Sequence, residues 1–128
     1  MEPYWIHWPE TRIRRELNTG RTFIRSFVYQ LEYDIEAKHT QRHKSDWQTV
    51  ARFDHDIEGP HDVYEEGLHL DIYRYGEKEN VVTDFPPIEV KRAPRFCEEF
   101  LDQNATFLLG RFERWHGIRG RWRAQSSE

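Results

Sequence analysis

The sequence has one cysteine, no long hydrophobic run, no internal repeat and no low-complexity linker. A single cysteine, Cys97, excludes an internal disulfide framework and a zinc site built from paired cysteines. No window approaches the roughly 18 consecutive apolar residues of a membrane-spanning helix. The first ten residues have neither a basic start nor an apolar stretch. We therefore expect a cytoplasmic protein that does not enter a membrane.

The length and composition predict one folded domain. A chain of 128 residues can bury one hydrophobic core but not two independent ones. Hydrophobic residues make up 37% of the chain and charged residues 33%, so the aromatic side chains, at 15%, must supply much of the buried area. Disordered chains are poor in aromatic residues, which argues against global disorder.

The net charge of −4 hides an uneven distribution of charge along the chain. Between residues 54 and 89 there are eleven acidic residues and only two basic ones, Arg74 and Lys78. Both ends of the chain are instead rich in arginine. This asymmetry predicts a basic surface beside an acidic surface that carries histidines.

Alternation of apolar and polar residues predicts an antiparallel sheet in the first two thirds of the chain. In the second expected strand the alternation points Trp47, Ala51 and Phe53 toward the core, and Val50, Arg52 and Asp54 toward the opposite face. The expected strands are 22–36, 47–55 and 68–75, and a short return strand begins at 81 after a hairpin turn at 76–80.

From Pro94 onward the hydrophobic period changes to that of a helix. We expect an α+β fold, a three- to four-stranded antiparallel sheet with a long C-terminal helix packed on it. In this division, 1–20 is irregular or short helical, 21–85 forms the sheet, 93–116 the helix and 117–128 a basic aromatic tail.

Residues 52–71 concentrate three histidines, four aspartates and one arginine. Such a cluster suits RNA cleavage by the 2′-hydroxyl group without a metal or other cofactor, because histidine titrates near neutral pH and can transfer protons. We predict His61 and His69 as base and acid in either order, with Arg52 or Arg74 as a phosphate clamp. The expected supporting residues are Asp54, Asp71 and Tyr73.

Two other interpretations use the same residues. His55, His61 and His69 could bind a divalent metal such as Zn or Mn in a metal-dependent hydrolase, although their spacing matches no strong metal motif. Alternatively, the histidines are structural and the chain is a non-enzymatic protein-binding module or a homodimer. Histidine and aspartate in the middle of a strand, as at His69 and Asp71, favour a functional site, because β-propensity disfavours aspartate there.

The C-terminal run alternates arginines with aromatic residues, a pattern that can clamp phosphates and stack unpaired bases of RNA. The alternative is that its aromatic residues are core and its arginines pair with the acidic segment. The candidate nucleic-acid-binding residues are Arg111, Arg114, Trp115, Arg119, Arg121, Trp122 and Arg123.

The order of these features resembles the TumE-like family of prokaryotic toxin–antitoxin proteins over roughly residues 20 to 102. Arg52-Phe53-Asp54 is similar to that family's Arg-aromatic-Asp element, Pro60-His61 to its Pro-His turn, and His69 to its later histidine. The family's Asn after the Asp is replaced here by His55. The resemblance implies a ribonuclease toxin that is neutralised by a small helix-turn-helix antitoxin.

Overall fold

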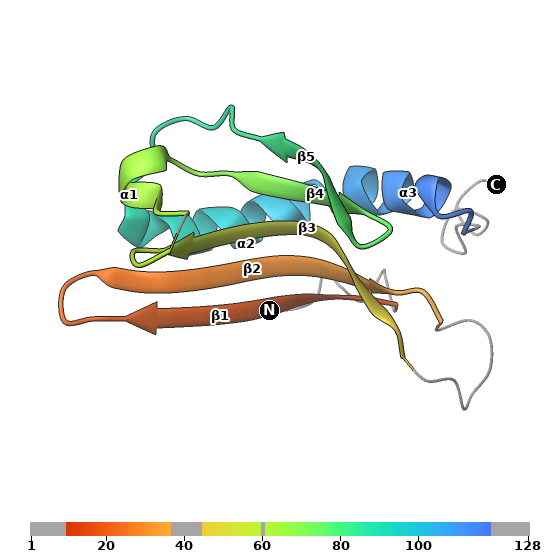
Figure 1. Ribbon diagram of the computed structural model, residues 1–128, viewed down its shortest axis with the longest axis horizontal. Coiled ribbons are helices and arrows are strands. Elements are labelled where there is room, and N and C mark those ends of the chain that lie inside the picture. The colour runs from red at the N-terminus through yellow and green to blue at the C-terminus, as the bar shows by residue number, and fades with distance from the viewer. Residues whose placement is uncertain (1–9, 37–44, 60, 119–128) are drawn as a thin grey trace.

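The computed structural model describes residues 10–36, 45–59 and 61–118. It contains one antiparallel sheet whose five strands lie side by side in chain order (Figure 1). The strands are β1 (Thr11–Thr19), β2 (Ile24–Asp34), β3 (Trp47–Asp56), β4 (Leu70–Arg74) and β5 (Glu77–Val82). The predicted α+β class, with an antiparallel sheet followed by C-terminal helices, is confirmed.

Two helices, α2 (Ala93–Gln103) and α3 (Ala105–Trp115), cover one face of the sheet (Figure 1). A short helix, α1 (Val63–Glu66), lies at one end of the sheet, and the 3-10 turn η2 (Val90–Arg92) leads directly into α2. The C-terminal end of α3 lies at the other end of the sheet. Within the described ranges, no helix has the length and apolar character needed to cross a membrane.

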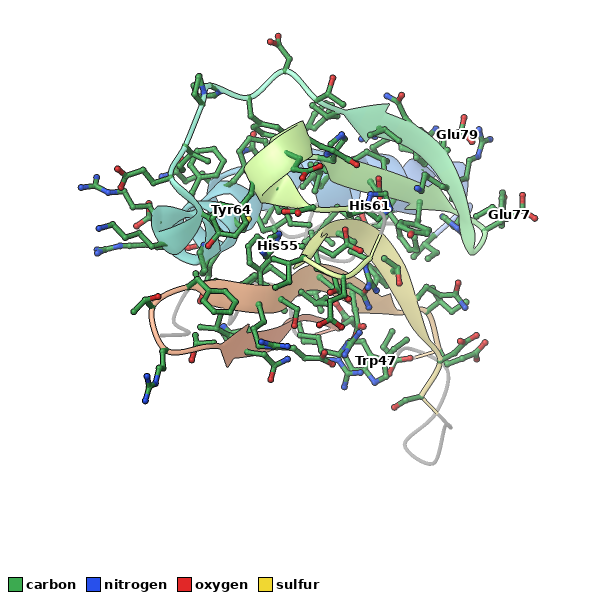
Figure 2. All side chains as sticks on the ribbon, turned by 60° about the vertical axis from the view of Figure 1, so that its left-hand side comes forward. Trp47, His55, His61, Tyr64, Glu77 and Glu79 are labelled. Atoms are coloured by element: carbon green, nitrogen blue, oxygen red, sulfur yellow. The ribbon has the colours of Figure 1, made fainter. Side chains whose placement is uncertain are left out.

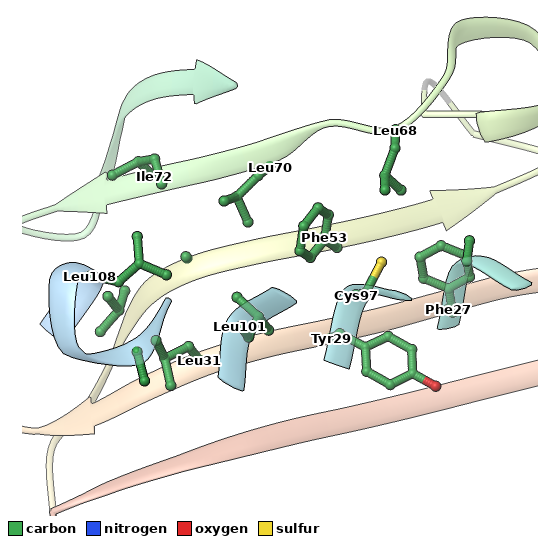
Figure 3. Close-up of a cluster of buried hydrophobic side chains, with 14 of the residues drawn as sticks. Phe27, Tyr29, Leu31, Phe53, Leu68, Leu70, Ile72, Cys97, Leu101 and Leu108 are labelled. Atoms are coloured by element: carbon green, nitrogen blue, oxygen red, sulfur yellow. The ribbon is translucent and has the colours of Figure 1, made fainter. Parts of the chain in front are cut away.

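The core lies between the helices and the side chains of one strand parity. Phe27, Tyr29 and Leu31 of β2 alternate onto this face and are buried (Figure 3). Cys97 and Leu101 of α2 face them and are completely buried. Each large apolar side chain removed from water contributes about 1.5 to 3 kcal/mol, so this alternation stabilises the sheet–helix pair.

The sheet has five strands rather than the three or four predicted, because β1 lies where an irregular or short helical segment was expected. It pairs with β2 from Thr11 to Thr19 as an edge strand. Thr11 is its only buried residue, and Leu17 is 49% exposed. Charged side chains on an edge strand discourage pairing with other chains. Because most of β1 is charged and exposed, its sequence shows no alternation of apolar and polar residues.

The hairpin between β4 and β5 turns earlier than predicted. Arg74 pairs with Glu77, so the turn consists of Tyr75 and Gly76 alone, with φ angles of 54° and 79°. Two consecutive positive φ angles are typical of tight two-residue hairpin turns. Of the residues predicted as a turn, 77–80 therefore belong to β5, and β4 begins at Leu70 rather than at residue 68.

A β-bulge reverses the predicted facing of the first residues of β3. Leu31 pairs with Ala51 but Glu32 pairs with Thr49, which leaves Val50 without a partner. Val50 is buried instead of lying on the open face. Trp47, predicted to face the core, lies on the opposite face.

The predicted helix 93–116 is two helices separated at Asn104. The backbone of Asn104 (φ −107°, ψ 12°) leaves the helical region, and its side-chain Nδ2 donates to the carbonyl oxygen of Phe100 at 2.9 Å. A short amide side chain competes in this way with regular helical hydrogen bonding. The hydrophobic stripe continues across the break, since Leu101 and Leu108 are both buried.

Glu98 and Asp102 lie one turn apart on α2, in contrasting surroundings. Arg15 of β1 donates two hydrogen bonds to Glu98, at 3.1 and 2.7 Å, and these bonds lower the pKa of Glu98. Burial, and secondarily the charge of Glu98, raise the pKa of Asp102. Within the described ranges, its buried Oδ1 has no hydrogen-bond partner. Ionised Asp102 therefore destabilises the fold.

We predict that Asp102→Asn stabilises the protein at pH 7 by up to about 1 kcal/mol, a modest gain because the side chain is partly solvated. A raised pKa means that the wild-type fold loses stability as the pH rises above the ordinary Asp value of 3.8. The gain should disappear at lower pH, where the wild-type carboxyl is also neutral. Urea unfolding at both pH values measures it, with exposed Asp84→Asn as the control. A less stable Asp102→Asn protein at pH 7 contradicts the prediction.

Candidate functional site

The sheet face opposite the helices carries a polar row across three strands. Gln30, Arg52 and Asp71 are neighbours in the strand register. The Arg52 guanidinium donates to Gln30 Oε1 at 3.0 Å and to Asp54 Oδ2 at 3.2 Å. Asp71 is buried, with its Oδ2 3.6 Å from Lys78 Nζ. The structure thus places Arg52, Asp54 and Asp71 on one face.

Glu32, which the sequence analysis did not single out, neutralises part of the basic N-terminal segment. Its buried carboxylate accepts from Arg12 Nε at 2.6 Å and from Gln30, and Arg14 Nε lies 3.6 Å away. The Arg12 guanidinium also lies 3.9 Å above the ring of Trp47. Arg12 reaches Glu32 because the two residues are directly opposite each other in the β1–β2 pair. The sequence did not reveal this contact because β1 was not predicted.

His61 and His69 come together at the end of the sheet that carries α1. Their ring centroids are 6.2 Å apart, and both residues are partly exposed. His69 Nδ1 lies 3.1 Å from the carbonyl oxygen of Gly67. A carbonyl only accepts, so Nδ1 carries the hydrogen and the neutral ring keeps its free lone pair on Nε2.

The backbone around these two histidines is fixed by neighbouring groups. The N–H of Asp56 donates to the carbonyl oxygen of His61 at 2.9 Å, which closes the loop after β3. Phe53 pairs with Leu70. The paired residues of β3 and β4 end there, so His69 and Asp54 each lie one residue beyond the last pair. His69 is two residues before Asp71 in the chain, at the entry to β4.

His55 has a different environment from the other two histidines of the segment. It is buried, although the metal interpretation grouped it with the partly exposed His61 and His69. Its Nε2 lies 3.1 Å from the carbonyl oxygen of Ile24, and its Nδ1 accepts from the N–H of Val63 at 3.0 Å. Both ring nitrogens thus join β3 to β2 and α1. Figure 2 shows His55, His61 and Tyr64 gathered where β3 leads into α1.

The geometry does not support the metal interpretation that includes His55. A metal ion could bind His55 only if one of its two hydrogen bonds to the backbone broke. Among the described residues, no group of three or more His, Cys, Asp or Glu side chains is arranged to hold a metal ion. Cys97 is completely buried, and burial raises the pKa of its thiol, which is the environment of a packing residue rather than a nucleophile.

Tyr73 and Arg74 differ in their relation to the predicted site. Tyr73 is partly buried and pairs with Lys78, the residue that contacts Asp71. Arg74 lies near the C-terminal end of α3, with its guanidinium 5.0 Å from the ring of Trp115. The structure separates Arg74 from Arg52, so Arg52 is the remaining candidate for the phosphate clamp.

The described part of the C-terminal arginine–aromatic run lies far from the histidine pair. Arg111 stacks against Phe107 and Trp115, each 4.9 Å from its guanidinium. Burial, together with the charge of Arg114, lowers the pKa of Arg111. These residues belong to α3, whose C-terminal end is opposite α1 (Figure 1). Four further candidates lie outside the described residues, namely Arg119, Arg121, Trp122 and Arg123.

Fold and site together define a class of α+β protein: a five-stranded antiparallel meander with helices on one face and a polar opposite face that ends in a histidine pair. The chain belongs to the family described as a domain of unknown function, DUF7718, whose model matches residues 3–118. No curated protein and no solved structure matches it. The family description states no activity, so the function must be argued from the site.

We predict that His55→Ala destabilises the protein by about 2 to 4 kcal/mol, because it opens a cavity and leaves the buried Val63 N–H and Ile24 carbonyl unpaired. His61→Ala, the matched control on the partly exposed loop, should cost less than about 1 kcal/mol. Urea unfolding followed by circular dichroism measures both. Equal losses would show that His55 does not hold this end of the sheet.

Proposed function

We propose that this protein is a metal-independent endoribonuclease in which His61 and His69 transfer the protons. The observation that supports this is the 6.2 Å separation of the two ring centroids, both of partly exposed residues on the segments that flank α1. Two imidazoles at this separation can approach opposite sides of one phosphodiester group, with one near the attacking oxygen and the other near the leaving oxygen.

The hydrogen bonding of His69 supports one order of the two roles, which we adopt in the proposal. With its Nδ1–H held by the Gly67 carbonyl, Nε2 of His69 is the base that removes the 2′-hydroxyl proton. The 2′-oxygen attacks phosphorus, the bond from phosphorus to the 5′-oxygen breaks, and protonated His61 delivers its proton to that oxygen. The products are a 2′,3′-cyclic phosphate and a 5′-hydroxyl, and the transfer consumes no water in this step.

Arg52 is the group we assign to the negative charge that develops on the phosphoryl oxygens. Its side chain is 29% exposed and is held in place by Gln30 and Asp54, so a guanidinium edge is pre-oriented at the sheet surface. Asp54 accepts a hydrogen bond from Arg52 at 3.2 Å and lies one residue beyond the last β3–β4 pair, as His69 does. Asp71 and Tyr73, through Lys78, support this row from β4 and β5.

A nuclease that cleaves cellular RNA is toxic unless it is restrained. The resemblance of Arg52-Phe53-Asp54, Pro60-His61 and His69 to the TumE-like elements supports a toxin in a prokaryotic cytoplasm. Its partner would be a helix-turn-helix antitoxin protein. RNA cleavage by the purified protein tests the chemistry, and growth of bacteria that express the chain tests the toxicity.

Purified protein is expected to cleave single-stranded RNA in the presence of a chelator and to leave cyclic phosphate ends. His61→Ala and His69→Ala should each lower the rate by about 10²-fold or more, because each removes a proton-transfer group. Exposed Glu77→Gln is the control. Loss of cleavage in chelator would instead favour the metal-dependent hydrolase, and full activity in both His variants would contradict the proposed mechanism.

In bacteria, induced expression of the wild-type chain is expected to arrest growth, and His69→Ala should relieve the arrest at equal protein level. Growth curves with immunoblotting measure this. A harmless wild-type chain that nevertheless cleaves RNA in vitro would contradict the toxin role and leave the nuclease proposal intact.

One observation favours a non-enzymatic binding module or a homodimer as the second candidate function. His116, like His55, uses both ring nitrogens: Nδ1 lies 2.8 Å from the Phe112 carbonyl, and Nε2 accepts from the N–H of Tyr75 at 2.9 Å. Two histidines are therefore structural. If His61→Ala and His69→Ala destabilise the protein as much as the loss expected for His55→Ala, this candidate gains over the nuclease.

A further inference from the structure

A second exposed feature lies at the same end of the sheet as the histidine pair. η2 and the first turns of α2 surround an open hollow lined by Lys91, Arg92, Arg95 and Phe96, with Ile88 and Glu99. Figures 1 and 2 place this start of α2 at the end that carries α1. The hollow thus combines three cations with an aromatic side chain.

The cations of this hollow do not serve the stability of the fold. The first turn of α2 has no acidic residue, and cations near the start of a helix oppose its dipole. The Arg92–Glu89 and Arg95–Glu99 ion pairs, at 3.4 and 3.2 Å, are exposed and therefore contribute little. The arginine side chains are 75% and 87% exposed, so either can exchange a carboxylate for a phosphate.

Tyr64 presents an exposed aromatic ring on α1, the helix that lies between His61 and His69 in the chain. It is 52% exposed on α1, three residues after His61. Its backbone N–H donates to Oδ1 of the capping residue Asp62 at 3.0 Å, and its ring meets the edge of buried His55, with centroids 5.4 Å apart. Tyr64 is therefore held in place while much of its surface remains open.

We propose that this end of the molecule, comprising Tyr64 and the hollow at Lys91, Arg92 and Arg95, binds single-stranded RNA as the substrate surface of the proposed nuclease. A base stacks on Tyr64, and phosphates along the strand contact the cations. Glu65 and Glu66 flank Tyr64 on α1, so α1 receives a base rather than a phosphate. Stacking on an exposed ring requires an unpaired base, which selects single-stranded RNA.

Among the described residues, this surface takes the place of Arg111 and Arg114 as the proposed RNA contact. Arg111 and Arg114 lie on α3, which leads away from the histidine pair. The guanidinium of Arg111 is already stacked between two rings. The inference rests on the proposed nuclease function, but binding can be measured without cleavage.

The test compares two matched triple variants for binding of a short fluorescein-labelled 2′-O-methyl RNA, which lacks the attacking hydroxyl. Tyr64→Ala with Arg92→Gln and Arg95→Gln removes one exposed aromatic ring and two charges at this surface. Phe107→Ala with Arg111→Gln and Arg114→Gln removes the same groups on α3. Fluorescence anisotropy between about 50 and 200 mM salt gives affinity and salt dependence.

The first variant should bind about tenfold or more weakly, and its salt slope should fall by about 1.4, or about 0.7 for each lost phosphate contact. The second variant should change affinity less than about threefold. Circular dichroism verifies folding, and the single variants Arg95→Glu and Arg114→Glu repeat the comparison if a triple variant unfolds.

Equal effects of the two variants, a larger effect on α3, or no RNA binding by the wild-type chain would each overturn the inference. If the wild-type chain cleaves RNA but one of these results is found, the nuclease proposal stands and the proposed binding surface is wrong. Binding with the expected pattern but without His-dependent cleavage keeps the surface as an RNA-binding site and removes the nuclease.

Discussion

The buried imidazole of His55 is the interaction on which the functional end of this molecule depends. It joins the start of β2, the end of β3 and the first residue of α1 through one donor and one acceptor. It anchors the start of α1, the helix that follows the His61 loop and presents Tyr64. Because it satisfies two buried backbone groups, its contribution is to position these residues and not to react.

The sheet has two chemically distinct faces, and β2 is central to both. On one face its aromatic and aliphatic side chains pack against α2, and on the other Gln30 and Glu32 lie among arginines. Buried charge is tolerated only with close partners, which Arg12 provides for Glu32. Because Glu32 partly neutralises the basic N-terminal strand, the arginines of η2 and α2 are the more accessible cations.

Sequence patterns predicted the strands and helices that bury one face against the core. They missed the features that depend on pairing with another strand. The alternation in β2 and the helical stripe after Pro94 follow from contact with a single core. Edge strand β1 has almost no buried side chain, so no alternation marked it. The bulge at Val50, which moved Trp47 to the other face, exists only as a mismatch between two strands.

The sequence by itself determined the α+β class and the concentration of histidine and aspartate in one segment, because composition and period are local properties. The tertiary structure decided which histidines are buried and which are open. His55, His61 and His69 are chemically identical, and they differ only in what the folded chain places around each ring. It also decided that the hollow at Lys91, Arg92 and Arg95 lies at the α1 end of the sheet, whereas the C-terminal end of α3 lies at the other end. The distance in space between residues that are far apart in the sequence depends on how the strands and helices pack, which local sequence patterns do not specify.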